Sequence, residues 1–165
     1  MRQEIFFAYI SQRSILPTLT HCNIDRSFEA ADDYVWANRI IVHCADVLRY
    51  CYGDGPKNTS AYTELVDYCD SWMALKPSTF APMYYKDADE WNLFPEVWLL
   101  GDAVVTGMQH YYLARILLTA HNPQLPRLGP ASKSALVRME EEVKSYVKII
   151  CGMALSNPRA PPNFA

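Results

Sequence analysis

The chain has 165 residues, of which 50% are apolar and 13% aromatic, so it can fold as one domain around a substantial core. Its net charge of −3 gives no basic field to attract phosphates, which speaks against direct nucleic-acid binding. The longest apolar run, VWLLGDAVVTGM, is interrupted by Asp102, so no membrane span is expected.

Clusters of proline and glycine divide the chain into segments whose apolar residues recur with helical spacing, and we find no period-2 strand pattern. The first predicted helix covers about 2–12 and the second about 30–52. The apolar seam of the second helix consists of Ala37, Ile41, Cys44, Leu48 and Cys51, flanked by Ile40 and Val47. Its other side is predicted to be polar, with Arg39, His43, Asp46 and Arg49.

A third helix is predicted over about 61–75, with Ser60 as its N-cap because a serine hydroxyl accepts an otherwise unpaired backbone N–H. Its inward face is expected to hold Tyr62, Leu65, Cys69 and Trp72, and its outward face Glu64, Asp67 and Asp70. The loop that follows, KPSTFAPMYYKDADEW, is rich in aromatic residues. We therefore expect this loop to pack down on the domain.

A fourth helix is predicted from about 95 to 121, with Pro95 at its first position and Asn122-Pro123 after its end. Its formal charges are limited to Glu96, Asp102 and Arg115. A helix that is apolar on nearly every side is enclosed by its neighbours. We therefore expect this segment to be the central helix of the fold.

A fifth helix is predicted over about 132–156, with an apolar seam of Leu136, Met139, Val143, Val147, Ile150 and Ala154. The predicted fold class is all-α, an antiparallel bundle or array of four to five helices around the long central helix 95–121. Residues 1–156 are predicted to form a single helical domain and 157–165 an irregular tail.

The cysteines do not form a metal-binding pattern. The five are Cys22, Cys44, Cys51, Cys69 and Cys151, an odd number at wide spacing, which is typical of a reduced intracellular protein. Seven residues along one helix separate Cys44 from Cys51 by about 10 Å, whereas two ligands of one zinc ion lie within about 4 Å of each other. Both are predicted to be core residues, and no metal or cofactor is expected in this chain.

The stretch MQHYYLARILLTAHNP places His110, Tyr111 and Arg115 on the predicted central helix, although the chain has no G-x-S-x-G, H-E-x-x-H or phosphate-loop motif. The favoured interpretation is a packed helix, in which Arg115 needs an oxygen partner from another segment or reaches the surface. One alternative is a small helical enzyme that uses His110. Another is an apolar small-molecule pocket lined by Trp72, Trp98, His110, Tyr111 and Arg115.

Several segments resemble the regulatory region of fungal transcription factors whose DNA-binding module is a six-cysteine binuclear zinc cluster. The most specific pieces are KPSTFAP (76–82), FPEVW (94–98), QHYYLARILL (109–118) and ICGMALSN (150–157). The helices RQEIFFAYISQR (2–13) and VWANRIIVHCADVLRYCYG (35–53) also fit, so the resemblance covers nearly the whole chain.

The resemblance implies a non-catalytic domain in the nucleus, or alternatively the cytoplasm, that regulates transcription through protein partners, self-association or a small-molecule effector. In such factors the zinc cluster binds DNA. No C-x2-C-x6-C run occurs here, so this chain is expected to bind neither zinc nor DNA by the family's mechanism. The family's helical region also usually continues past a point like PPNFA, so a truncated product, a fragment and a relative without the cluster all stay open.

Overall fold

The computed structural model describes residues 1–15, 25–126 and 128–158. Its elements in chain order are α1 (Arg2–Ile10), α3 (Asp33–Tyr52), α4 (Thr59–Leu75), the 3-10 turn η1 (Ser78–Phe80), β1 (Tyr84–Lys86), β2 (Glu96–Trp98), α5 (Asp102–Ala120) and α6 (Pro130–Ser156). Helices dominate these ranges, which confirms the predicted all-α class. Cys22 and residues 159–165 of the predicted tail lie outside the described residues.

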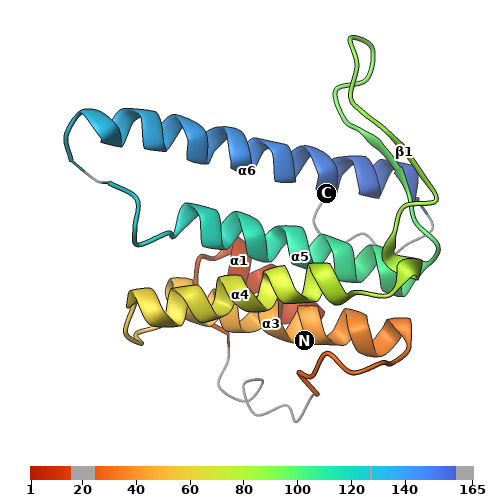
Figure 1. Ribbon diagram of the computed structural model, residues 1–165, viewed down its shortest axis with the longest axis horizontal. Coiled ribbons are helices and arrows are strands. Elements are labelled where there is room, and N and C mark those ends of the chain that lie inside the picture. The colour runs from red at the N-terminus through yellow and green to blue at the C-terminus, as the bar shows by residue number, and fades with distance from the viewer. Residues whose placement is uncertain (16–24, 127, 159–165) are drawn as a thin grey trace.

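Helix α5 lies at the centre of the array, with α3 and α4 on one side and α6 on the other (Figure 1). Thirteen of its 19 residues are buried, as expected for a helix enclosed by its neighbours. Gly107 lets α3 approach closely, because a Cβ there would lie 3.0 Å from Phe80 Cε1 and 3.2 Å from the Cα of Ala37. The prediction of an enclosed central helix is therefore confirmed.

The start of that helix is corrected, because it begins at Asp102 rather than at Pro95. Residues Glu96–Trp98 form β2 instead, which pairs antiparallel with β1 in the register Tyr84↔Trp98, Tyr85↔Val97 and Lys86↔Glu96. The expectation of a chain without strands was also wrong. A short apolar run does not by itself distinguish a strand from a buried helix, and Val and Trp favour the strand once a partner is available.

The segment after α4 does not pack down as expected. Phe80 is buried against Trp72, with ring centroids 5.4 Å apart, but residues 81–93 are exposed. They form most of a β-hairpin that stands away from the helices (Figure 1). Most of the aromatic side chains that suggested packing therefore face solvent.

Two of the four residues on the side of α3 predicted to be polar, Arg39 and His43, are buried, which corrects their roles. The guanidinium of Arg39 donates to the carbonyl oxygen of Glu29 at 2.8 Å and to Asp25 Oδ2 at 2.5 Å. His43 stacks on Tyr68 of α4, with ring centroids 4.4 Å apart. The segment before α3 and the neighbouring α4 thus cover Arg39 and His43, although the polar residue types on this face predicted exposure to solvent.

Helix α4 begins earlier than predicted, and its N-cap is Asn58 rather than Ser60. The Oδ1 atom of Asn58 accepts a hydrogen bond from the backbone N–H of Ala61 at 2.8 Å. Ser60 lies inside the first turn, where its hydroxyl contacts Glu64 Oε1 at 3.3 Å. Both residue types are good caps, so the local sequence did not decide between them.

The predicted seam of α6 is only partly buried. Ile150 is in the core, but Leu136 is 51% exposed and Val147 is 41% exposed. Helix α6 packs on α5 and, near its C-terminus, on β2. Those two neighbours cover only part of a wide apolar face, so one flank of α6 is open.

Candidate functional site

The predicted partner requirement of Arg115 is confirmed at a junction of three helices. Arg115 Nη1 lies 2.6 Å from Asp70 Oδ1 of α4, and Nη2 lies 3.9 Å from Glu142 Oε1 of α6. The guanidinium carbon also lies 6.0 Å from the ring centre of Tyr146. Two carboxylates and an aromatic face therefore compensate this partly buried cation.

Trp72 and Tyr111, two of the predicted pocket residues, stack on each other with ring centroids 5.7 Å apart and an interplanar angle of 21°. Trp72 is fully buried, and its Nε1 donates to the carbonyl oxygen of Trp36 at 3.0 Å. Burial raises the pKa of Tyr111, so its hydroxyl stays protonated. Tight stacking and hydrogen bonding give this pair the character of a core contact.

His110 is fully buried in the packing of α5. Its Nδ1 lies 2.8 Å from the carbonyl oxygen of Thr106, one turn earlier, and donates to it. Burial lowers the pKa of His110 to about 4, so the ring is neutral at pH 7. In this position His110 cannot exchange a proton with a substrate unless α5 moves away from its neighbours.

Trp98 lies apart from the other predicted site residues, on β2 beside the C-terminus of α6. It is 44% exposed, and its Nε1 donates to Glu96 Oε1 at 2.7 Å. The structure thus joins Trp72, Tyr111 and Arg115 in one part of the fold and places Trp98 in another. The predicted five-residue pocket does not form as a single cavity around these side chains.

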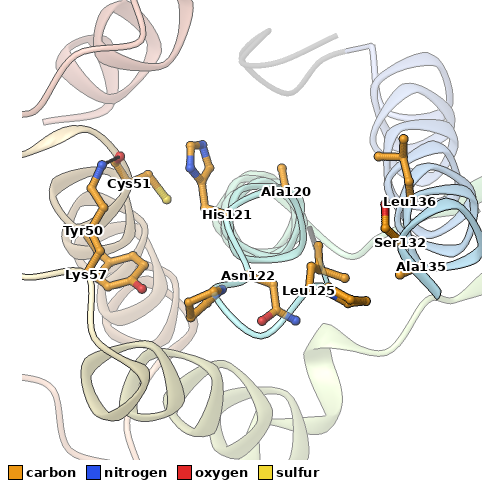
Figure 2. Close-up of a pocket in the computed structure, with 12 residues that line it drawn as sticks. Tyr50, Cys51, Lys57, Ala120, His121, Asn122, Leu125, Ser132, Ala135 and Leu136 are labelled. Atoms are coloured by element: carbon orange, nitrogen blue, oxygen red, sulfur yellow. Dashed lines mark hydrogen bonds between the residues drawn. The ribbon is translucent and has the colours of Figure 1, made fainter. Parts of the chain in front are cut away.

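A different hollow lies between the N-terminal half of α6 and the ends of the other helices, and we call it the α6 groove. It consists of two adjoining cavities of about 460 and 350 Å³, both lined by Asn122, Leu125 and Ala135. Figure 2 shows the first cavity, with Ser132 and Leu136 of α6 on one side and residues of the α3 end on the other. The second cavity reaches Arg115 and so adjoins the three-helix junction.

Apart from Arg115, the polar residues of the α6 groove differ from those predicted from the sequence. Lys57 Nζ donates to the carbonyl oxygen of Cys51 at 2.8 Å, and His121 lies across from it (Figure 2). Burial, assisted by the charge of Lys57, lowers the pKa of His121. Burial raises the pKa of Cys51 to about 12, so its thiol is not a nucleophile at neutral pH.

Sequence reasoning missed the α6 groove because its lining residues come from several segments that are distant in the chain. The side chains come from the end of α3, the first half of α4, the C-terminal part of α5, the turn 121–126 and the first half of α6, and they form no spaced motif. Asn122-Pro123 was a recognisable helix stop, yet nothing local indicated that the turn beyond it faces a cavity.

The junction of β2 with α6 is held by the last residues of the helix. The backbone N–H of Val97 donates to Ser156 Oγ at 3.0 Å, and that of Leu99 donates to Asn157 Oδ1 at 3.2 Å. Asn157 Nδ2 donates back to the carbonyl oxygen of Val97 at 2.8 Å. The edge of β2 that faces away from β1 is therefore bound to α6, which fixes the base of the hairpin.

Across residues 1–15, 25–126 and 128–158, no three His, Cys, Asp or Glu side chains gather as a metal site would require. No helix in those ranges combines the length and apolarity that crossing a membrane requires. No protein-family model, curated protein or solved structure matches this chain.

Proposed function

We propose that this chain is a non-catalytic helical domain that regulates transcription in the nucleus through protein contacts. The sequence resemblance to the regulatory region of fungal zinc-cluster factors suggests this role. The observation that carries it is the open flank of α6, where Leu136 is 51% exposed and Val147 is 41% exposed. Apolar side chains aligned along one helix beside a groove are typical of a contact surface.

The chemistry at the centre of the fold supports a role without catalysis. His110 is neutral and sealed, and the Cys51 thiol is held protonated by burial. Arg115 forms ion pairs with Asp70 and Glu142. These groups stabilise the helix contacts, whereas a nucleophile and base would have to meet each other and a substrate in a cleft.

The α6 groove is the site where we expect a partner helix or segment to bind. Its cavities of about 460 and 350 Å³ adjoin along α6, so an elongated partner could fill both. Leu136 borders the first cavity, and Met139 borders the second. A partner with apolar residues at helical spacing would cover these side chains and continue the packing of α6.

A tethering experiment tests this function. The chain is fused to an unrelated DNA-binding module, and a reporter with that module's site is measured in yeast. We expect the fusion to change reporter output at least several-fold relative to the module alone, and Leu136→Lys to abolish the change because a charge cannot be buried in the contact. Val137→Lys is the matched control, since Val137 is equally exposed at 51% on the same helix but is not among the residues that line the groove.

Two results would contradict the proposal. One is unchanged reporter output from a fusion that accumulates normally in the cell. The other is an equal loss of output from Leu136→Lys and Val137→Lys, because it would mean that α6 matters only for folding or expression. Thermal denaturation of both purified variants checks that they fold alike.

A small-molecule effector in the α6 groove is the second candidate. Tyr50 lines the first cavity, and its hydroxyl is buried without a hydrogen-bond partner in the described part of the chain. Lys57 lines the same cavity as Leu125 and Leu136, so an anionic head with an apolar body fits the chemistry of this cavity. Decanoate serves as the probe. It should raise the melting temperature of the wild type but not of Lys57→Met, and equal shifts in both would exclude this site.

A further inference from the structure

The acidic charge of this protein is concentrated in the hairpin and the turn after it. Residues 83–102 contain one base, Lys86, and five acids, a net charge of −4 in a chain whose total is −3. The remaining residues contain 14 bases and 13 acids, a net charge of +1. The charged residues of this stretch are all exposed, namely Lys86, Asp87, Asp89, Glu90, Glu96 and Asp102.

An exposed apolar surface lies where this acidic region meets the end of α6, and we call it the Trp98 patch. Its members are Tyr84, Trp98, Leu100 and Leu155, all exposed. Tyr84 is the register partner of Trp98 across the hairpin. Trp98 and Leu155 border one cavity of about 260 Å³, and Trp98 and Leu100 border another of about 450 Å³. The indole therefore stands between two hollows that are open to a partner.

The Trp98 patch is held in place by the fold. The hydrogen bonds of Ser156 and Asn157 fix β2 to α6, and Glu96 Oε1 accepts from the Trp98 indole at 2.7 Å. Gly152 brings the chain at Pro95 close to α6, since a Cβ there would collide with the Pro95 carbonyl oxygen. A surface fixed in this way loses little conformational freedom on binding, which favours affinity.

We propose that the Trp98 patch binds a basic, amphipathic polypeptide segment of a partner protein. Apolar side chains of the segment enter the hollows on either side of Trp98, and its lysines or arginines face carboxylates such as Asp87 and Asp102. This inference rests on the proposed function and specifies the chemistry of a partner. A second copy of the chain fits less well, because a symmetric contact would bring two surfaces of charge −4 together.

Fluorescence anisotropy with a defined probe tests the inference. The probe is a fluorescein-labelled helical peptide of leucine and lysine, and its control has glutamate in place of lysine. We expect the lysine peptide to bind and the glutamate peptide not to bind. Raising NaCl from about 0.05 to about 0.5 M should weaken binding several-fold, because exposed charges are screened. Trp98→Ala should weaken it about tenfold.

Matched variants separate this surface from general charge attraction. Asp87→Asn combined with Glu90→Gln removes two charges from the hairpin, and Glu64→Gln combined with Asp67→Asn removes two from exposed positions on α4. The first pair should weaken binding about fivefold and the second should leave it unchanged. Phe7→Ala, which removes an exposed aromatic side chain from α1, should also have no effect.

Several outcomes would overturn the inference. These are equal binding of both peptides, an unchanged affinity of Trp98→Ala, or equal effects of the two charge pairs. Sedimentation showing a dimer that Trp98→Ala dissociates would assign the patch to a second copy instead. If the chain binds the peptide but fails the reporter experiment, the proposed function is refuted and the docking surface is not. If the chain passes the reporter experiment but does not bind the peptide, the docking surface alone is refuted.

Discussion

Arg115 Nη1 lies 2.6 Å from Asp70 Oδ1, and this ion pair joins the central helix α5 to α4. The two partners are unequally placed, since the side chain of Arg115 is 20% exposed and that of Asp70 is 60% exposed. Solvent screens the pair on the Asp70 side, so its charge attraction contributes less than about 1 kcal/mol. The stem of Arg115 and its contact with Tyr146 add packing that does not depend on Asp70.

This asymmetry predicts that substituting Arg115 lowers the free energy of unfolding more than substituting Asp70 does. Arg115→Ala should lower the free energy of unfolding by about 2 kcal/mol, because it removes packing as well as charge. Asp70→Asn should lower it by less than about 1 kcal/mol, since Glu142 still compensates the arginine. Urea denaturation monitored by circular dichroism measures both, and equal losses would mean that the ion pair carries the whole effect.

The close packing at Gly152 predicts that even the methyl group of an alanine there lowers the stability of the fold. Its Cβ would collide with the carbonyl oxygen of Pro95 and lie 3.0 Å from Pro95 Cγ, so Gly152→Ala must push the hairpin base away from α6. We expect a loss of about 2 kcal/mol and faster proteolysis within residues 83–100. Gly55→Ala is the control, because a Cβ at Gly55 meets nothing within 4 Å. Similar behaviour of both variants would argue against the close β2–α6 contact.

The position of the N-cap of α4 predicts that Asn58 contributes more to the free energy of unfolding than Ser60 does. Asn58→Ala should cost about 1 kcal/mol, because it leaves the backbone N–H of Ala61 without its 2.8 Å acceptor. Ser60→Ala should be nearly neutral, since its hydroxyl contacts only the exposed Glu64. Chemical denaturation of the two variants measures both losses of stability. A larger loss for Ser60→Ala would mean that Ser60 is the N-cap, as predicted from the sequence.

Two buried histidines predict a loss of stability in mild acid. Burial lowers the pKa of His43 to about 3 and that of His110 to about 4, from an ordinary value of 6.5. Below pH 6.5 the unfolded chain takes up protons that the folded chain does not, so the free energy of unfolding falls as pH drops toward 4. Between pH 7 and 5.5 the two residues together should cost about 2.5 kcal/mol.

Urea denaturation at several pH values measures how the free energy of unfolding changes with pH. This slope can be compared between variants even when their absolute stabilities differ. His43→Gln or His110→Gln should each remove about half of the loss that these two residues cause, while His121, whose pKa is also lowered, keeps its own smaller contribution. Asp25 does not interfere in this window. Hydrogen bonds from Ser27, with help from Arg39, hold the pKa of Asp25 at about 2, so its contribution is lost only below its ordinary value of 3.8. A flat profile from pH 7 to 5.5 would show that the histidines are accessible.

The Arg115 junction shows how far sequence reasoning reached at the candidate site. The need for a partner followed from the cost of burying a cation on an apolar helix, and that cost is a property of the residue and its neighbours in the chain. The identity of the partners did not follow. Asp70 and Glu142 lie on two other helices, and only the packing of α4 and α6 around α5 brings them to one guanidinium.

The sequence by itself determined the all-α class, the approximate position of each helix and the enclosed character of α5, because helical periodicity and proline or glycine stops act over a few residues. Tertiary structure decided the rest. Strand pairing of Glu96–Trp98 requires Tyr84–Lys86 from a separate segment. The burial of Arg39 and the exposure of Leu136 depend on which neighbours cover each face. Contacts between distant segments, absent from any local pattern, therefore placed the groove and the hairpin surface.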